Sequence, residues 1–224
     1  MKEKLSAIEV RILGALIEKK MTTPAYYPLS VNALCNACNQ KSNRSPVTDY
    51  TEAQIENTLE KLRDKGWVRS VTGTGRVVRY KHILGEKLGL SSEAVALMAV
   101  LMLRGAQTVG ELRSRTERMH AFESLAQVEE TLDVLSNREP EALVIKLARM
   151  PGQKEARYLH LLKEDAKSLE AYFSAMENAP QEPETAAPVD QADKLTALEN
   201  EVANLRSALE KLTEEFETFR QQFE

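Results

Sequence analysis

In the first part of the chain, apolar residues follow a helical spacing in some segments and alternate with polar residues in others. Ile8, Ile12 and Leu16 recur at intervals of four residues with apolar neighbours, which predicts an amphipathic helix. Ser6 and Glu9 form a capping box at its start. The pattern as a whole predicts helices over residues 6–20, 30–39 and 51–65 and strands over residues 67–71 and 77–82.

The same order of elements then follows a second time. The pattern predicts helices that begin near Ser91, Thr108 and Ser124 and strands over residues 143–149 and 156–161. Residues 53–62 return with similar spacing as residues 126–135, and residues 79–84 return as residues 157–162. The two matches keep the same order, so the chain is predicted to contain two copies of one small domain.

Three helices followed by a two-stranded hairpin is the element order of a winged helix-turn-helix domain. In helix-turn-helix proteins the recognition helix enters the major groove of DNA, and the hairpin forms the wing. The sequence therefore predicts a mainly α fold with small β-hairpins: tandem winged helix-turn-helix domains over residues 1–85 and 86–177, the second with a trailing helix, and a coiled-coil helix at the C-terminus.

The last part of the chain changes in composition. Residues 178–193 contain prolines, small residues and carboxylates, which predicts a flexible linker. Residues 194–224 then show apolar positions that alternate at three and four residues, a pattern typical of a coiled coil. The apolar positions predicted to form the dimer interface are Leu195, Leu198, Val202, Leu205, Leu209, Leu212, Phe216, Phe219 and Phe223.

The charges that flank these heptads indicate how two copies would pair. A parallel pair would place Glu201 opposite Arg206 and Glu215 opposite Arg220, and both juxtapositions are attractive. We therefore expect a parallel homodimer. The alternative is an amphipathic helix that folds back on its own domains.

Charge is distributed unevenly along the chain. Residues 1–85 contain 14 Lys and Arg against 8 Asp and Glu, a net charge of +6, whereas residues 86–177 have a net charge of −3 and residues 178–224 of −7. A basic first domain is consistent with an anionic partner. We find no signal peptide and no apolar run long enough to span a membrane, and the 2 cysteines fit a reducing compartment, so a cytoplasmic protein is expected.

Three regions of the first domain contain candidate DNA contacts. The polar loop after the second helix offers Lys41, Asn43 and Arg44, whose side chains are of the kind that bind phosphates. The third helix offers Gln54, Asn57 and Lys61 as groups that reach bases, and the first wing offers Arg76, Arg79 and Lys81. A solvated loop and a charge-protected edge strand are the structural alternatives.

Other features of the sequence argue against DNA as the partner and against catalysis. Both third helices contain several carboxylates, which repel phosphate, and the second has no Lys or Arg from Glu123 to Asn137. Cys35 and Cys38 are spaced like half a zinc site, but there is no second cysteine pair, so buried packing is the preferred interpretation. We predict no metal, cofactor or catalytic residue, and hence no enzyme.

Residues 27–34, 37–47 and 77–82 carry a family resemblance. The run Asn39-Gln40-Lys41-Ser42-Asn43-Arg44 is long and unusual, and together these segments resemble the YceH-like family of bacterial proteins over about residues 5–162. The resemblance implies tandem winged helices and a bacterial cytoplasmic setting, and it implies no activity, ligand or catalytic residue.

Two functional hypotheses follow. In the first, the protein resembles a transcription regulator that binds double-stranded DNA through its first domain and dimerises through its coiled coil. In the second, the winged helices act as an adaptor or scaffold that binds other proteins through the acidic second domain and does not contact DNA. The modest basic excess supports the first hypothesis, and the acidic third helices support the second.

Overall fold

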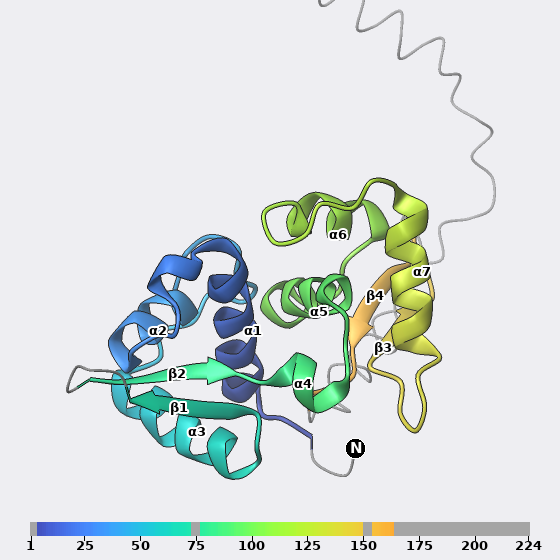
Figure 1. Cartoon of the computed structure of the whole chain (residues 1–224). Coiled ribbons are helices and arrows are strands. Elements are labelled where there is room, and N and C mark those ends of the chain that lie inside the picture. Colours follow the sequence, from blue (N-terminus) through green and yellow to red (C-terminus); the bar gives the residue numbers. More distant parts are fainter. Residues whose placement is uncertain (1–3, 73–76, 150–153, 164–224) are drawn as a thin grey trace, which may run out of the picture. The chain divides into compact units, whose positions relative to one another are not determined.

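The computed structural model describes residues 4–72, 77–149 and 154–163 (Figure 1). These residues belong to one compact unit, which spans Met1–Ala179. The predicted linker, the predicted coiled coil with its heptad positions, and the candidate Arg76 lie outside the described residues. The dimer interface and the acidic linker therefore remain predictions.

The described residues form a mainly helical fold with two small antiparallel sheets of two strands each. The first half contains α1 (Ala7–Thr22), the short 3-10 helix η1 (Pro24–Tyr26), α2 (Val31–Cys38), α3 (Glu52–Asp64), β1 (Val68–Thr72) and β2 (Val78–His82). After α4 (Leu84–Leu88), the second half contains α5 (Ser92–Arg104), α6 (Val109–Thr116), α7 (Leu125–Ser136), β3 (Val144–Leu147) and β4 (Arg157–His160). The predicted order of helices and strands is confirmed in both halves.

The helices begin where the sequence supplies side-chain caps. Capping boxes form at Ser6, Thr51 and Thr108, each with the Glu or Gln three residues later. Gly66, after α3, has a φ angle of 66°, a left-handed conformation that glycine adopts without strain and that turns the chain into β1. Local sequence therefore accounts for these boundaries.

The two hairpins have the same architecture. β1 and β2 pair antiparallel with Val68 opposite His82, and β3 and β4 pair with Val144 opposite His160. In each half one residue just before the second helix adds a third, single-residue pairing: Leu29 with Tyr80 and Gln107 with Tyr158. These bridges were not predicted from the sequence, and they attach each hairpin to the segment that precedes the second helix of its own half.

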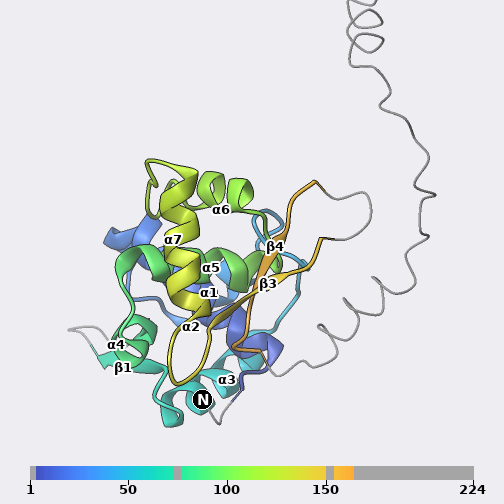
Figure 2. The same ribbon diagram turned by 90° about the vertical axis from the view of Figure 1, so that its right-hand side faces the viewer.

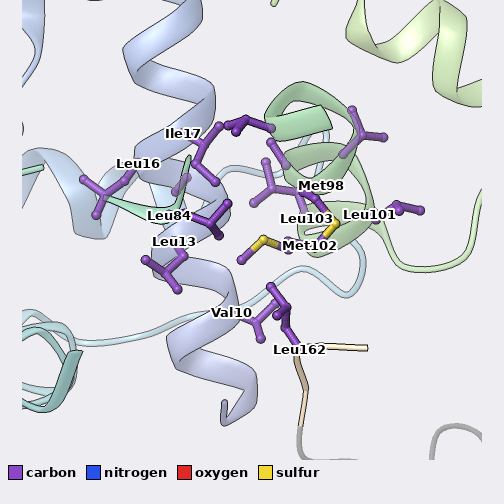
Figure 3. Close-up of a cluster of buried hydrophobic side chains, with 14 of the residues drawn as sticks. Val10, Leu13, Leu16, Ile17, Leu84, Met98, Leu101, Met102, Leu103 and Leu162 are labelled. Atoms are coloured by element: carbon purple, nitrogen blue, oxygen red, sulfur yellow. The ribbon is translucent and has the colours of Figure 1, made fainter. Parts of the chain in front are cut away.

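α1 and α5, the first helices of the two halves, pack against each other through a continuous apolar core. In Figure 3, Val10 and Ile17 of α1 lie in one cluster with Met98 and Met102 of α5. Gly14 permits this approach, because a Cβ atom there would lie 2.9 Å from Cγ of Leu103. A glycine inside a helix costs about 0.5–1 kcal/mol relative to alanine, and here close packing explains it.

The remaining elements surround this helix pair. β2 contacts α1 in the first half, while β4 and α7 both contact α5 in the second half, as Figures 1 and 2 show. Within α5, which begins close to the predicted start near Ser91, every residue from Ala94 to Leu103 is buried. None of the helices among the described residues is long and apolar enough to cross a membrane.

The connection between the halves differs from the sequence expectation. Residues 84–88 form the short helix α4, which spans the predicted domain boundary after residue 85 and was not predicted from the sequence. Leu84 and Leu88 are buried there, and Leu5 near the N-terminus donates a backbone hydrogen bond to Leu162 at the end of the second half. The halves are thus joined at several points, and the boundary predicted after residue 85 remains a prediction.

Candidate nucleic-acid interface

The outward face of the first hairpin is basic. Tyr80 and His82 point inward and are buried, so Arg79 and Lys81 alternate to the other face. Arg69 of β1 pairs directly with Lys81, which places it on the same face. Like charges at directly opposed positions destabilise a hairpin, so this arrangement is unfavourable in the absence of an anion.

These basic side chains are only weakly held by the rest of the protein. Nη1 of Arg79 donates a 2.9 Å hydrogen bond to the carbonyl of Pro28. Arg69 lies 3.6 Å from Glu86, but both side chains are about 60% exposed, and such surface pairs contribute little. Lys81 is half-buried. Arg69 was not among the candidates predicted from the sequence, although its position next to the buried Val68 in β1 indicates the outward face.

The candidates on α3 lie on its exposed side. Ile55, Leu59 and Leu62 are buried, whereas Asn57 and Lys61 are exposed. Gln54 is exposed too, but its Oε1 accepts a 2.9 Å hydrogen bond from the backbone N–H of Thr51 as part of the capping box. Part of its hydrogen-bonding capacity is therefore used in the helix cap. The α3 carboxylates Glu52, Glu56, Glu60 and Asp64 are exposed beside these groups.

The loop between α2 and α3 holds its three candidates differently. Lys41 is exposed. Asn43 is exposed and adopts a left-handed backbone with φ of 62°, and its side-chain oxygen accepts a hydrogen bond from Arg104 of the second half. Arg44 is buried, with a fully inaccessible side chain. Contacts of Asn43 and Arg44 thus hold the loop in a defined conformation, while Lys41 stays exposed.

Arg44 is occupied within the fold. Its Nη1 and Nη2 donate to the two carboxylate oxygens of Glu18 at 3.1 and 2.6 Å, and its Nε donates to the carbonyl of Ala37 at 3.0 Å. A buried bidentate pair of this kind is not available to a phosphate. Arg44 is therefore not placed as the surface contact that was predicted. That prediction rested on residue type, which does not reveal whether a side chain is buried.

Arg11 is a second buried arginine, which the sequence analysis did not single out. It donates to the carbonyls of Cys38 at 3.0 Å and Pro46 at 2.6 Å, and so ties the middle of the loop to the end of α2. Burial, and then the positive charge of Arg44, lower the pKa of Arg11. Its place inside the apolar stripe of α1 was the signal that could have revealed this role.

The second hairpin lacks the basic outward face. The register that aligns His82 with His160 places Ile145 at the position of Arg69 and Leu159 at that of Lys81. Arg157 corresponds to Arg79, but its Nη1 donates to Glu111 at 2.8 Å and to the carbonyl of Ala106 at 2.9 Å. Among the described strand residues, the Arg69–Lys81 pair of the first hairpin therefore has no basic counterpart in the second.

Cysteine and histidine side chains offer little chemistry in the part of the chain that is described. Cys35 and Cys38 are buried free thiols, and burial raises the pKa of Cys38 to about 12 and also raises that of Cys35. Burial lowers the pKa of both His82 and His160 to about 4. No group of three or more His, Cys, Asp or Glu residues that could hold a metal occurs among the described residues.

Comparison with known proteins gives a consistent family assignment. The family model described as "Protein of unknown function, DUF480" matches residues 5–153. UPF0502 protein GSU0233 of Geobacter sulfurreducens is 46% identical over 221 residues, which cover 98% of each chain. UPF0502 protein YceH of Salmonella schwarzengrund is 46% identical over 217 residues, which cover 95% of this chain and 97% of the relative.

The match to the relatives extends across almost the whole chain, so it includes the region beyond the described residues as well as both hairpins. The names of these relatives state no activity, ligand or partner. The chain belongs to the DUF480 family, which includes the UPF0502 and YceH proteins.

Proposed function

We propose that each half is a winged helix-turn-helix domain and that the first half binds double-stranded DNA. The support for the fold is the repeated order of three helices and a hairpin, together with the equivalent bridges at Leu29 and Gln107. The proposal for DNA rests on one observation: Arg69, Arg79 and Lys81 share the outward face of the first hairpin, with Arg69 directly opposite Lys81.

Other groups would complete the interface. Asn57 and Lys61 on the exposed side of α3 would approach base edges, and Lys41 would contact a phosphate near the start of that helix. The segment of residues 39–51 is longer than the three- or four-residue turn of a typical helix-turn-helix motif. Arg11 and Arg44 hold this long segment in place and so give α3 a fixed position.

The proposal is tested by fluorescence anisotropy with a mixed set of labelled genomic duplexes at two salt concentrations. The full chain should bind at low salt, and affinity should fall steeply as salt rises, because cations displaced from phosphates are released on binding. The double variant Arg69→Glu/Lys81→Glu should weaken binding at least about tenfold and lower the salt slope by roughly two.

A matched control is available in the second hairpin. Lys146→Glu/Lys154→Glu makes the same change in net charge at two exposed cations of the second half. We expect this variant to bind DNA within about twofold of the parent chain. No binding at low salt, or equal weakening by both double variants, would refute the proposed interface.

We also propose that the C-terminal heptads join two copies in parallel, which would present two first hairpins to one duplex. The support is the alternation of apolar positions and the attractive pairs such as Glu201 with Arg206. Light scattering should give a dimer for the full chain and a monomer for a chain ending at residue 179. A shortened chain that stayed dimeric would contradict this role of the heptads.

Protein binding is a second candidate function, favoured by the surface of α7. Val134 is 64% exposed and Leu125 48% exposed on this helix, beside the exposed carboxylates Glu129, Glu130 and Asp133. Apolar and acidic groups together suit a basic protein partner rather than a phosphate backbone. Affinity capture that depends on Val134 and Glu130 in a chain that does not bind DNA would favour this function.

A further inference from the structure

A hollow of about 250 Å³ lies where the two halves meet. Its walls come from the end of α1, the loop after α2, the end of α5 and the end of α6. Four cationic side chains line it: Lys19, Arg104, Arg115 and Arg118. None of them was a candidate in the sequence, because they are distant along the chain and only the packing of α1 against α5 brings them together.

The carboxylates near the hollow do not balance its positive charge. Glu18 is the only carboxylate that lines it in the described part of the chain, and both of its oxygens accept hydrogen bonds from the buried Arg44. Lys19 lies 3.7 Å from the same carboxylate, so two cations share one negative charge.

The same excess occurs on the α6 side. Glu111 accepts from Arg157 at 2.8 Å and forms an ion pair with Arg115 at 3.3 Å, so it too is shared by two guanidinium groups. Glu117, which neighbours Arg118 in sequence, lines a separate hollow with Arg113. The cations of this hollow therefore outnumber the carboxylates that pair with them.

Arg104 and Arg118 add two further charges. Arg104 donates to the neutral side-chain oxygen of Asn43, and burial together with the nearby charge of Arg115 lowers its pKa. Arg118 is exposed and has no hydrogen bond or ion pair with any described residue. A concave site with several unbalanced guanidinium groups attracts anions, because charge is concentrated there and water is partly excluded.

The hollow also offers neutral polar groups. Ser42 and Gln40 line it, in addition to the cations, and a hydroxyl and an amide suit the oxygens of a phosphate. Its volume lies just below the range of pockets for drug-sized ligands, which favours a small anion over a large one. A DNA duplex would not fit within a hollow of this size.

We propose that this hollow is a binding site for a small phosphate-bearing ligand, held by Arg104, Arg115 and Arg118 with Lys19 completing the site. The ligand is either free phosphate or a small phosphate monoester. Because the site draws on both halves, its occupation stabilises their junction. The inference is independent of DNA binding by the first hairpin.

The test uses the full chain, with inorganic phosphate and ribose 5-phosphate titrated separately at constant ionic strength. Isothermal titration should show saturable binding, and the melting temperature should rise with ligand concentration, since a ligand that binds only the folded state stabilises it. Tighter binding of ribose 5-phosphate would identify a monoester site, and equal or tighter binding of inorganic phosphate would identify a free-phosphate site.

Arg118→Gln is the informative variant because the described structure shows no contact that its loss would break. It should weaken phosphate binding at least about tenfold, as expected for loss of a charge-assisted contact. The matched control is Arg63→Gln, which removes an exposed cation from α3 and should leave the affinity within about twofold.

Three results would overturn the proposal. They are an absence of saturable binding by either anion at millimolar concentration, equal weakening by Arg118→Gln and Arg63→Gln, and the same rise in melting temperature with chloride at matched ionic strength. Circular dichroism of both variants, with melting temperatures equal to that of the parent in the absence of anion, establishes that any loss is a loss of binding.

Discussion

The two hairpins of this protein share a backbone but not a surface. In both, a tyrosine and a histidine of the returning strand are buried, and the tyrosine pairs with a residue that precedes the second helix. On the outward face, Arg69 and Lys81 of the first hairpin correspond to Ile145 and Leu159 of the second. The two halves therefore keep the same buried positions while their outward surfaces differ in charge.

The connections that lead into the third helices differ in a related way. In the first half, Arg11 and Arg44 bind carbonyls from inside the core. In the second half, Arg113 donates to the carbonyls of Phe122 at 3.2 Å and Glu123 at 3.0 Å from an exposed position. A buried guanidinium stabilises a long loop strongly but makes its own replacement costly, so the first half should be the more sensitive to mutation here.

The largest expected effect comes from removing the buried guanidinium. Arg44→Met leaves Glu18 without its bidentate partner, and breaking a buried ion pair in this way costs about 3–5 kcal/mol. Urea denaturation should show this loss of unfolding free energy. Lys41→Met, in the same loop but exposed, serves as the control and should change stability by less than about 0.5 kcal/mol. Similar losses in both variants would mean that the buried pair does not stabilise the loop.

The two buried histidines make stability depend on pH. Their folded pKa of about 4 lies below the ordinary value of 6.5, so the unfolded chain binds more protons between these values. Their contribution is therefore fully present above pH 6.5 and is lost as pH falls toward 4, by about 2 kcal/mol per histidine between pH 7 and pH 5.

His82→Leu separates this effect from other titrations. Neither ring nitrogen of His82 has a hydrogen-bond partner among the described residues, whereas Nδ1 of His160 accepts a 3.3 Å bond from the backbone of Leu162. The variant should lose about half of the histidine-dependent pH sensitivity between pH 7 and pH 5 while folding normally at pH 7. Denaturant melts at several pH values measure this, and an unchanged slope would contradict burial of a neutral His82.

The next largest loss of stability is expected at the contact between the halves. Gly14→Leu forces a side chain into space held by Leu103 and Met102, and such overpacking typically costs about 1–3 kcal/mol. Gly110→Ala is the control in the second half, since the nearest atom beyond its chain neighbours and helix backbone, Oγ1 of Thr108, lies 4.0 Å from the added Cβ; it should be neutral or slightly stabilising. Thermal denaturation compares them, and equal stability of the two variants would argue against close α1–α5 packing.

The smallest effect is expected when the outward residues of the two hairpins are exchanged. Arg69→Ile/Lys81→Leu gives the first hairpin the outward residues of the second and should weaken DNA binding by about tenfold. The reciprocal change, Ile145→Arg/Leu159→Lys, should raise DNA affinity by no more than a fewfold, because exposed carboxylates remain on α7. Anisotropy titrations of both variants provide the measurement. An unaltered DNA affinity after the first exchange would mean that Arg69 and Lys81 do not distinguish the two hairpins in DNA binding.

Much of the fold could be predicted from local patterns. The capping boxes at Ser6, Thr51 and Thr108 and the apolar stripe through Ile55 and Leu59 define helices that the structure confirms. Such signals depend on residues within one or two turns of each other, so they are readable without tertiary information. The helix α4 was missed because five residues contain too few positions to show a period.

The candidate site was only partly predictable. Arg79 and Lys81 could be placed on one strand face from alternation, but Arg69 enters that face through its pairing with Lys81. Arg44 was chosen because guanidinium groups often bind phosphate, yet the fold surrounds it with Glu18 and the carbonyl of Ala37. Residue type gives the chemistry a side chain is capable of, and burial determines whether a ligand can reach it.

By itself, the sequence determined the family, the repeated order of helices and strands, and the asymmetry of charge along the chain, since each of these depends on residue identity and short-range spacing. Only the tertiary structure determined that Arg44 is internal, that α1 and α5 share a core, and that Lys19, Arg104 and Arg118 line one hollow. These last features depend on contacts between residues far apart in the chain, which side-chain packing selects and no local pattern specifies.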